Sequence, residues 1–306
     1  MLAAGLIVSR FIHFAAVLAL FGATLFPLYA HAGSPDDAAR LRPRGWLRAP
    51  MASSAALALA GGLGWFAFTA GDMSGSLAGA ADPRVLMTVL TATDFGPLWA
   101  GRLALIVAVL LAILAGGLRR PSWAIASLSA LILVSLAGTG HARAGEGWPG
   151  LAHVAADAAH LLAAGTWLGG LWPLAAALSW AHRGDVQRMR ASGELLMRFS
   201  GVGYVAVAVL VVTGVVNSWF LLGSIEALTS GVYGRLLLLK LALFGGMAAL
   251  AAGNRFWITP RLHHADADGI GLWLHRIRRH VAAELALGLL VVAVVAVLGT
   301  LQPSGA

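Results

Sequence analysis

The chain has 306 residues, of which 59% are hydrophobic and only 11% are charged, and its formal net charge is +8. Soluble domains carry roughly 25% charged residues, so this composition excludes an ordinary soluble protein and predicts a membrane protein. Cysteine is absent, which excludes disulfides and thiolate metal sites and leaves His, Met, Asp, Glu and backbone as metal ligands. Because no stretch outside the apolar runs is long enough for a second domain, we expect one domain over residues 1–306.

Eight apolar runs are long enough to cross a bilayer, which requires about 20 residues each. They predict an all-α, polytopic bundle of eight transmembrane helices at about 3–30, 50–71, 98–118, 122–140, 151–180, 197–223, 234–258 and 281–301. The segment Ala30-His31-Ala32 resembles a signal-peptidase site. The apolar core before it is longer than in most signal peptides and an Arg-rich stretch follows, so we expect a retained span.

The basic residues fix the orientation, because cytoplasmic loops carry an excess of Lys and Arg. Fifteen of the 21 Lys and Arg residues follow the first, third, fifth and seventh spans. These loops are therefore predicted to be cytoplasmic and both termini periplasmic. In the external loop 72–97, Asp82 and Pro83 are typical of a helix start. They predict a short interfacial helix near 83–94, with Val85, Leu86, Val89 and Leu90 on one face.

Three polar residues interrupt the fifth run, His153-Val-Ala-Ala-Asp157-Ala-Ala-His160. Their spacings of four and three residues place all three on one helix face. His13, ten residues into the first run, is expected at a depth of about 15 Å, similar to that of His160. His141 ends the fourth run at the outer surface. Ionisable groups are costly inside a membrane and normally face a pathway or a site.

His13, His141, His153, Asp157 and His160 are therefore candidate metal ligands. A His/carboxylate set suits Cu(II), and Met73 or Met87 would assist with Cu(I). The alternative is that these histidines are core residues bonded to neighbouring helices. Candidate supporting residues are Arg10, Asn217 and Lys240. Arg10, Arg102, Arg235 and Lys240 are expected to snorkel to the headgroups or to pair with acids.

Two further features concern the cytoplasmic side and helix packing. The segment His263-His264 with Asp266 and Asp268 is a candidate exit site, although solvated loop residues explain it equally. Gly165 and Gly169 form a GxxxG pattern, which predicts close packing of two helices.

Five segments taken together resemble the copper resistance protein D (CopD/PcoD) family. They are RFIHFAAVLALFGATLFPLY (10–29), GHA (140–142), DAAHLLAAGTWLGGLWPL (157–174), RFSGVGYVAVAVLVVTGVVNSW (198–219) and YGRLLLLKLALFGGMAALAAGNRFWITPRL (233–262). The resemblance implies copper handling in the bacterial inner membrane, usually import toward the cytoplasm. It also implies a periplasmic copper-binding partner of the CopC type, which is sometimes fused to the same chain. No fused domain is present here, so a separate partner is expected. His13, His141 and His160 fall on motif positions of the family, and His153 and Asp157 lie in the same region.

These features predict a copper-binding inner-membrane transporter. We expect copper capture at His141 and His153 and passage by Asp157 to His13 and His160. The sequence has no P-loop and no cytosolic domain to hold an ATPase, so copper would move passively or with an ion, and no enzyme activity is expected. Because the basic residues mark the topology, no nucleic-acid partner is expected either. Two alternatives stay open: a haem-binding electron-transfer protein that uses paired intramembrane histidines, and a non-transporting copper scaffold or sensor.

Overall fold

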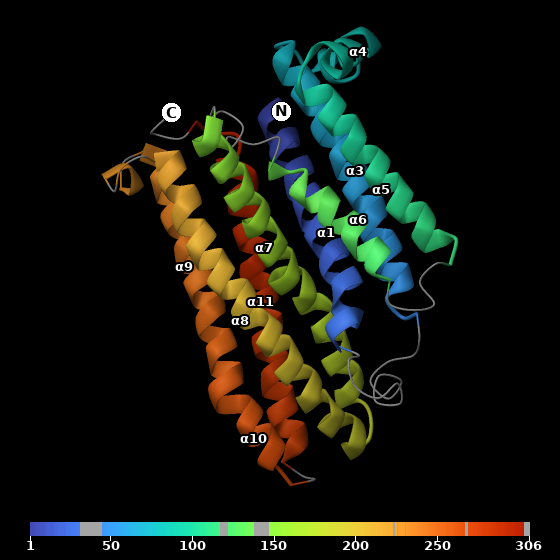
Figure 1. Cartoon of the computed structure of the whole chain (residues 1–306), viewed down its shortest axis with the longest axis vertical. Helices are drawn as coiled ribbons and strands as arrows, with labels where there is room; N and C mark the ends of the chain where they lie inside the picture. Colours follow the sequence, from blue (N-terminus) through green and yellow to red (C-terminus); the bar gives the residue numbers. More distant parts are fainter. Residues whose placement is uncertain are drawn as a thin grey trace.

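The fold is an all-helical bundle in which long apolar helices run up and down side by side (Figure 1). The computed structural model describes residues 1–30, 45–116, 122–137, 147–222, 224, 226–229, 231–266 and 269–302. The longer helices are α1 (Leu2–Ala30), α3 (Arg48–Met73), α5 (Phe95–Leu114), α7 (Gly147–His182), α8 (Val186–Leu222), α9 (Gly231–Gly253) and α11 (Ile270–Leu298). The shorter elements are η1 (Ala78–Ala80), α4 (Pro83–Ala92), α6 (Trp123–Val134), η4 (Glu226–Leu228), the π-helical η5 (Asn254–Ile258) and α10 (Thr259–His264).

Seven helices of the described chain are long and apolar enough to cross a membrane, with α9, η5 and α10 counted as one continuous span. The eighth predicted span, 122–140, begins as α6, which has 12 residues. Twelve residues rise only about 18 Å, which is less than the ~30 Å hydrocarbon core. α6 still runs antiparallel to α5, and both marked chain ends lie at one end of the bundle (Figure 1).

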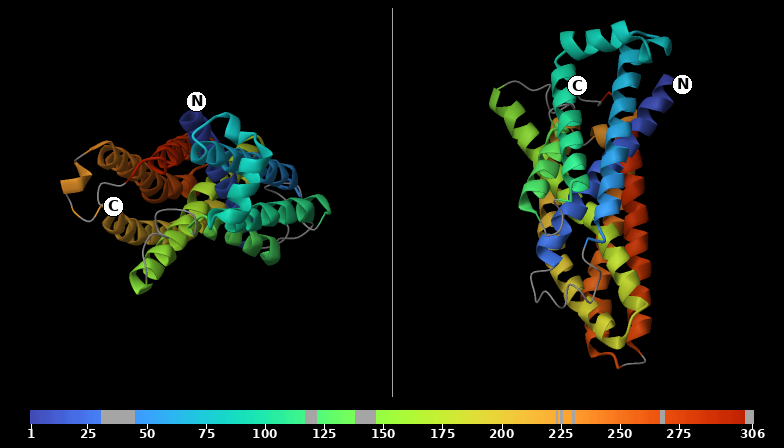
Figure 2. Two further views of the ribbon diagram at one scale, coloured as in Figure 1. Left: turned by 90° about the horizontal axis from the view of Figure 1, so that it is seen from above. Right: turned by 90° about the vertical axis from the view of Figure 1, so that its right-hand side faces the viewer.

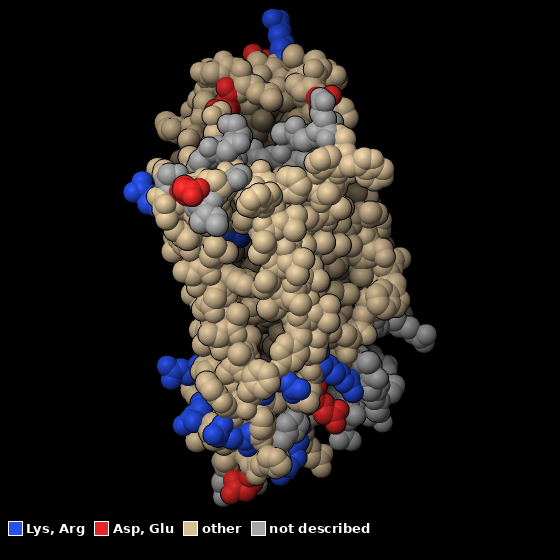
Figure 3. All heavy atoms as spheres, turned by 60° about the vertical axis from the view of Figure 1, so that its left-hand side comes forward, with Lys and Arg blue, Asp and Glu red and all other residues tan. Residues whose placement is uncertain are grey.

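The charge distribution agrees with the predicted orientation. Lys and Arg side chains gather at the end of the bundle opposite the chain termini, and a broad uncharged belt separates the two ends (Figure 3). By the positive-inside rule this basic end faces the cytoplasm. We call the opposite end, which carries α4 and the N-terminus, the outer end.

α4 confirms the short helix predicted after Pro83. The Asp82 side chain accepts a hydrogen bond from the Arg84 amide at 2.8 Å, which caps the helix. The predicted apolar face is the less exposed face of the helix. Val89 is buried, and Val85, Leu86 and Leu90 are half-buried. α4 lies across the outer end of α3 and α5 (Figure 2).

α1 is the central helix and packs against α3 and α6 on one side and α7 and α11 on the other. Its contact with α7 depends on glycine. A Cβ atom on Gly22 would collide with the backbone of Gly169, and a Cβ on Gly169 would collide with the Leu18 carbonyl. The Trp172 indole also donates to the Ala19 carbonyl at 3.1 Å. The close packing predicted from Gly165 and Gly169 is confirmed.

Candidate functional site

The three polar residues of α7 face one cavity in the outer half of the bundle. This cavity, of about 170 Å³, is lined by His153, Asp157 and His160. Three other helices contribute polar side chains to it: Arg10 from α1, Asn217 from α8 and Lys240 from α9. The structure therefore brings together three of the five candidate ligands with the candidate supporting residues Arg10, Asn217 and Lys240. We call this space the outer cavity.

His160 is held by a residue that the sequence did not single out. Its Nδ1 lies 3.0 Å from the Thr213 hydroxyl oxygen on α8. That hydroxyl donates its own proton to the Val209 carbonyl at 2.6 Å, so it accepts from His160 Nδ1–H. This assignment leaves the Nε2 lone pair of His160 available, which is the arrangement found in metal-binding histidines.

Asp157 is oriented from α8 and lies near a cation from α9. The Asn217 amide donates to Asp157 Oδ1 at 3.4 Å. Lys240 is close enough for its charge to interact with those of both Asp157 and His160. The outer cavity thus contains a carboxylate that attracts cations. It also contains an ammonium group that competes with an incoming cation for that carboxylate.

His153 occupies the outer part of the same face. It is buried, and its ring stacks on Phe220 of α8 with 4.7 Å between centroids and 9° between planes. Because α7 begins at the outer end, His153 lies about 10 Å nearer that end than His160. The polar face of α7 therefore leads from the outer end toward mid-membrane.

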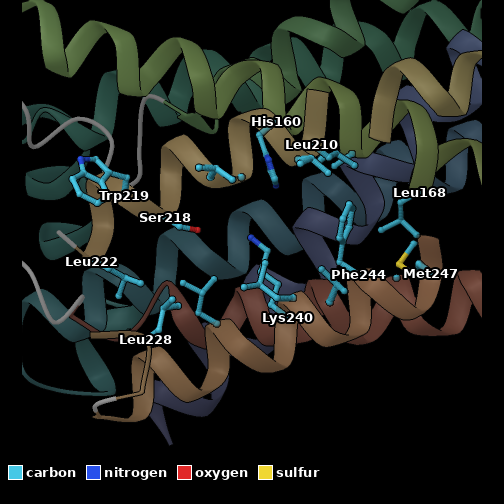
Figure 4. A pocket seen from close by; sticks show the side chains of 18 of the residues that line it. His160, Leu168, Leu210, Ser218, Trp219, Leu222, Leu228, Lys240, Phe244 and Met247 are labelled. Carbon is cyan, nitrogen blue, oxygen red and sulfur yellow. The ribbon is translucent and has the colours of Figure 1, made fainter. Parts of the chain in front are cut away.

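A larger cavity extends past His160 and Lys240 in both directions, from Leu222 and Leu228 at the outer end to Met247 deeper in the bundle. Its volume is about 430 Å³, and its walls come mainly from apolar residues of α7, α8, α9 and α11. Figure 4 shows His160 and Lys240 projecting into it from opposite sides. α8 and α9 make few contacts with each other, which leaves this space between them. We call it the central cavity.

His13 lies in a different environment from His160. It is completely buried, and its Nδ1 donates to the Ala58 carbonyl of α3 at 2.8 Å. Its ring lies between Trp65 and Trp99, with centroids 5.8 and 5.7 Å away. Its Nε2 has no hydrogen-bond partner within the described part of the chain. His13 thus faces α3 and α5, whereas His160 faces α8.

This separation bears on the haem alternative. Two axial histidines must approach one iron from opposite sides. Neither cavity that His160 lines includes His13, so the geometry gives no support to haem ligation by this pair.

Two further candidates lie outside these cavities. Met73 and Met87 are both 58% exposed near the outer end. His141 lies outside the described residues, as do Asp268 and the side chain of His263, whereas His264 and Asp266 are exposed. No group of three or more His, Asp or Glu side chains with metal-binding geometry occurs among the residues described.

Arg102 does not snorkel to the surface, which was one of the two expectations for basic residues in the spans. It is 1% exposed, and its Nε donates to the Ser135 hydroxyl at 2.7 Å. The guanidinium also lies over the Trp99 ring, 4.5 Å from the centroid. Arg102 therefore links α5 to the end of α6, and Arg10 and Lys240 face the outer cavity instead of the headgroups.

Comparison with known proteins supports a family assignment. The family model described as "Copper resistance protein D-like, N-terminal domain" matches residues 1–151, and that described as "Copper resistance protein D" matches residues 193–298. No solved structure matches the chain.

Curated relatives align along nearly the whole chain. Copper resistance protein D of Pseudomonas syringae pv. tomato is 34% identical over 97% of this chain and 96% of its own length. Inner membrane protein YebZ of Escherichia coli is 31% identical over 99% of this chain and 100% of its own length. Copper transport protein CutJ of Bacillus subtilis is 28% identical over 97% of this chain and 52% of its own length. The chain is a multi-pass inner-membrane protein that belongs to the copper resistance protein D family.

Proposed function

We propose that the outer cavity binds copper and that the protein moves copper from the periplasm toward the cytoplasm. The observation that carries this proposal is the convergence of His153, Asp157 and His160 on one cavity inside the bundle. Imidazole and carboxylate are suitable ligands for copper in a chain without cysteine. Relatives of this chain are named for copper resistance and copper transport.

The proposed path follows the polar face of α7. Copper enters at the outer end, where we propose that His141 and His153 capture it. It then passes Asp157 to the Nε2 lone pair of His160, which Thr213 leaves available. The central cavity passes His160 and continues on its inner side to Phe244 and Met247.

Lys240 has a specific role in this proposal. Its ammonium group neutralises part of the Asp157 charge when the site is empty, and it repels a copper ion bound at His160. A tethered cation of this kind keeps binding from becoming so tight that the ion is not released. Release toward the cytoplasm is further favoured by a membrane potential that is negative inside, by about 2.3 kcal/mol per charge per 100 mV.

His13 is proposed as a separate copper position, because its buried Nε2 has no partner in the described chain and the position belongs to the family motif.

We further propose that a small periplasmic copper-binding protein of the CopC type delivers copper to the outer end. Met73 and Met87 are exposed there and would offer thioether ligands to Cu(I).

Copper uptake into proteoliposomes tests the proposal directly. We expect wild-type protein to admit copper and the variant His160→Ala to lose most of that uptake. The matched control is His275→Ala, which removes an exposed histidine near the cytoplasmic end. Uptake by His160→Ala equal to wild type would refute the proposed path. Copper binding without any uptake by wild type would favour the scaffold or sensor alternative.

A further inference from the structure

A second buried polar cluster lies in the cytoplasmic half of the bundle, away from the outer cavity. Glu284 of α11 is 2% exposed and Asn254 at the start of η5 is 8% exposed. The Asn254 amide nitrogen donates to Glu284 Oε1 at 2.7 Å. No spacing pattern in the sequence indicated either residue, although Glu284 is the lone acid of the apolar run 281–301.

The π-helical segment η5 sets the position of this amide. The Thr259 hydroxyl donates to the Asn254 carbonyl at 2.8 Å across five residues, inside a wider helical turn. Such π segments are uncommon and occur frequently at functional sites. Here the segment places a buried amide beside the only acid of the neighbouring span.

Asn254 and Glu284 line a cavity of about 210 Å³. Trp167 lines both this cavity and the central cavity. Its ring packs edge-on against Phe244, with 5.9 Å between centroids and 88° between planes. The aromatic pair Trp167 and Phe244 therefore stands between His160 with Lys240 on the outer side and Asn254 with Glu284 on the cytoplasmic side.

The surroundings of Glu284 point to a proton rather than a metal ion. The other titratable side chains that line its cavity are Tyr204 of α8 and Arg255 of η5, and the Arg255 guanidinium contacts the Met197 sulfur. α7, α9 and α10 contribute no titratable group to the lining. His280 lies one turn before Glu284 on α11 but is not part of the lining, and Arg10 of α1 meets α11 only near Gly299.

One acceptor atom in the cluster indicates that the site lacks a hydrogen-bond donor. Asn254 Oδ1 is buried and accepts no hydrogen bond within the described residues. A carboxylate next to it cannot supply a donor, whereas a protonated carboxyl carries an O–H group that donates. Intramembrane carboxyl groups facing a cavity characteristically mark ion pathways and proton relays.

We infer that Glu284 and Asn254 form a proton-binding site on the cytoplasmic side of the Trp167 and Phe244 pair. The Glu284 carboxylate takes a proton from water, forming an O–H bond, and returns it to water as the carboxylate re-forms. This site does not depend on copper transport. Its use as the coupling site for copper movement rests on the proposed function.

Infrared difference spectroscopy of the purified, metal-free protein across a pH series tests this inference. We expect a protonated-carboxyl C=O absorption that disappears as pH rises and that decreases by one carboxyl per chain in Glu284→Gln. The matched control is Asp157→Asn, which alters the half-buried carboxyl of the outer cavity and must leave the Glu284 absorption intact. Asn254→Leu should shift its frequency, because the amide hydrogen bond is lost.

A measurement on the unaltered chain guards against misfolding of the variants. Labelling glutamate with carbon-13 shifts the absorption of glutamate carboxyls only, and the sequence has four glutamates. A titrating band that moves with the label supports the site. A wild-type spectrum without a titrating, label-sensitive band, or a full band in folded Glu284→Gln, would overturn it. Because no copper is present, failure of copper binding leaves this result interpretable.

Discussion

The contact between α1 and α7 makes a quantitative prediction for Gly22→Ala. The added methyl group would overlap the Gly169 backbone, which cannot rotate away as a side chain can. Restoring an ordinary carbon contact of ~3.5 Å requires the two helices to separate by roughly 1.5 Å. Overpacking of this kind lowers the free energy of unfolding by about 1–3 kcal/mol. Because the contact is with backbone, we expect Gly22→Ala to lie at the upper end of this range.

Thermal unfolding in detergent measures this effect, with an expected loss of roughly 3–5 °C in Tm. The control is Gly245→Ala in α9, where an added Cβ meets no atom within 4 Å. Alanine should be neutral or slightly stabilising there, because it favours the helix by up to ~1 kcal/mol relative to glycine. A Gly22→Ala protein as stable as the Gly245→Ala control would refute the close approach of α1 and α7.

Two further substitutions examine the outer cavity. Thr213→Val removes the acceptor that orients His160, and we expect copper affinity in a chelator competition to fall about 10–100-fold. Thr166→Val is its control, since that hydroxyl donates to the Leu162 carbonyl of its own helix; equal affinities in the two variants would show that Thr213 does not support copper binding. Lys240→Met removes a cation from the cavity, and copper affinity should rise about tenfold or more as charge repulsion is lost. A weaker affinity in Lys240→Met would contradict the competing role of the ammonium group.

The sequence predicted what depends on spacing along a single helix. The intervals between His153, Asp157 and His160 required one face, and the three side chains do line one cavity. The distribution of arginine predicted which end of the bundle is basic, and the structure confirms it. The cap at Asp82 was likewise a local pattern, and α4 begins where it predicts.

The sequence did not predict the features that depend on how each helix is rotated relative to its neighbours. Depth along the helix predicted that His13 and His160 reach similar levels, but it carries no information on the direction of each side chain. His13 is turned toward α3 by its bond to Ala58. Thr213 and Asn254 acquire importance only from partners on other helices, and no single-helix pattern distinguishes them.

Elemental analysis of purified protein after copper exposure and desalting most directly tests the central claim that the polar face of α7 binds copper. Wild type should be compared with His160→Ala, and His275→Ala should serve as the control. We expect near-stoichiometric copper in wild type and in the control, with a clear loss in His160→Ala. Equal copper in all three proteins, or iron in place of copper, would contradict it.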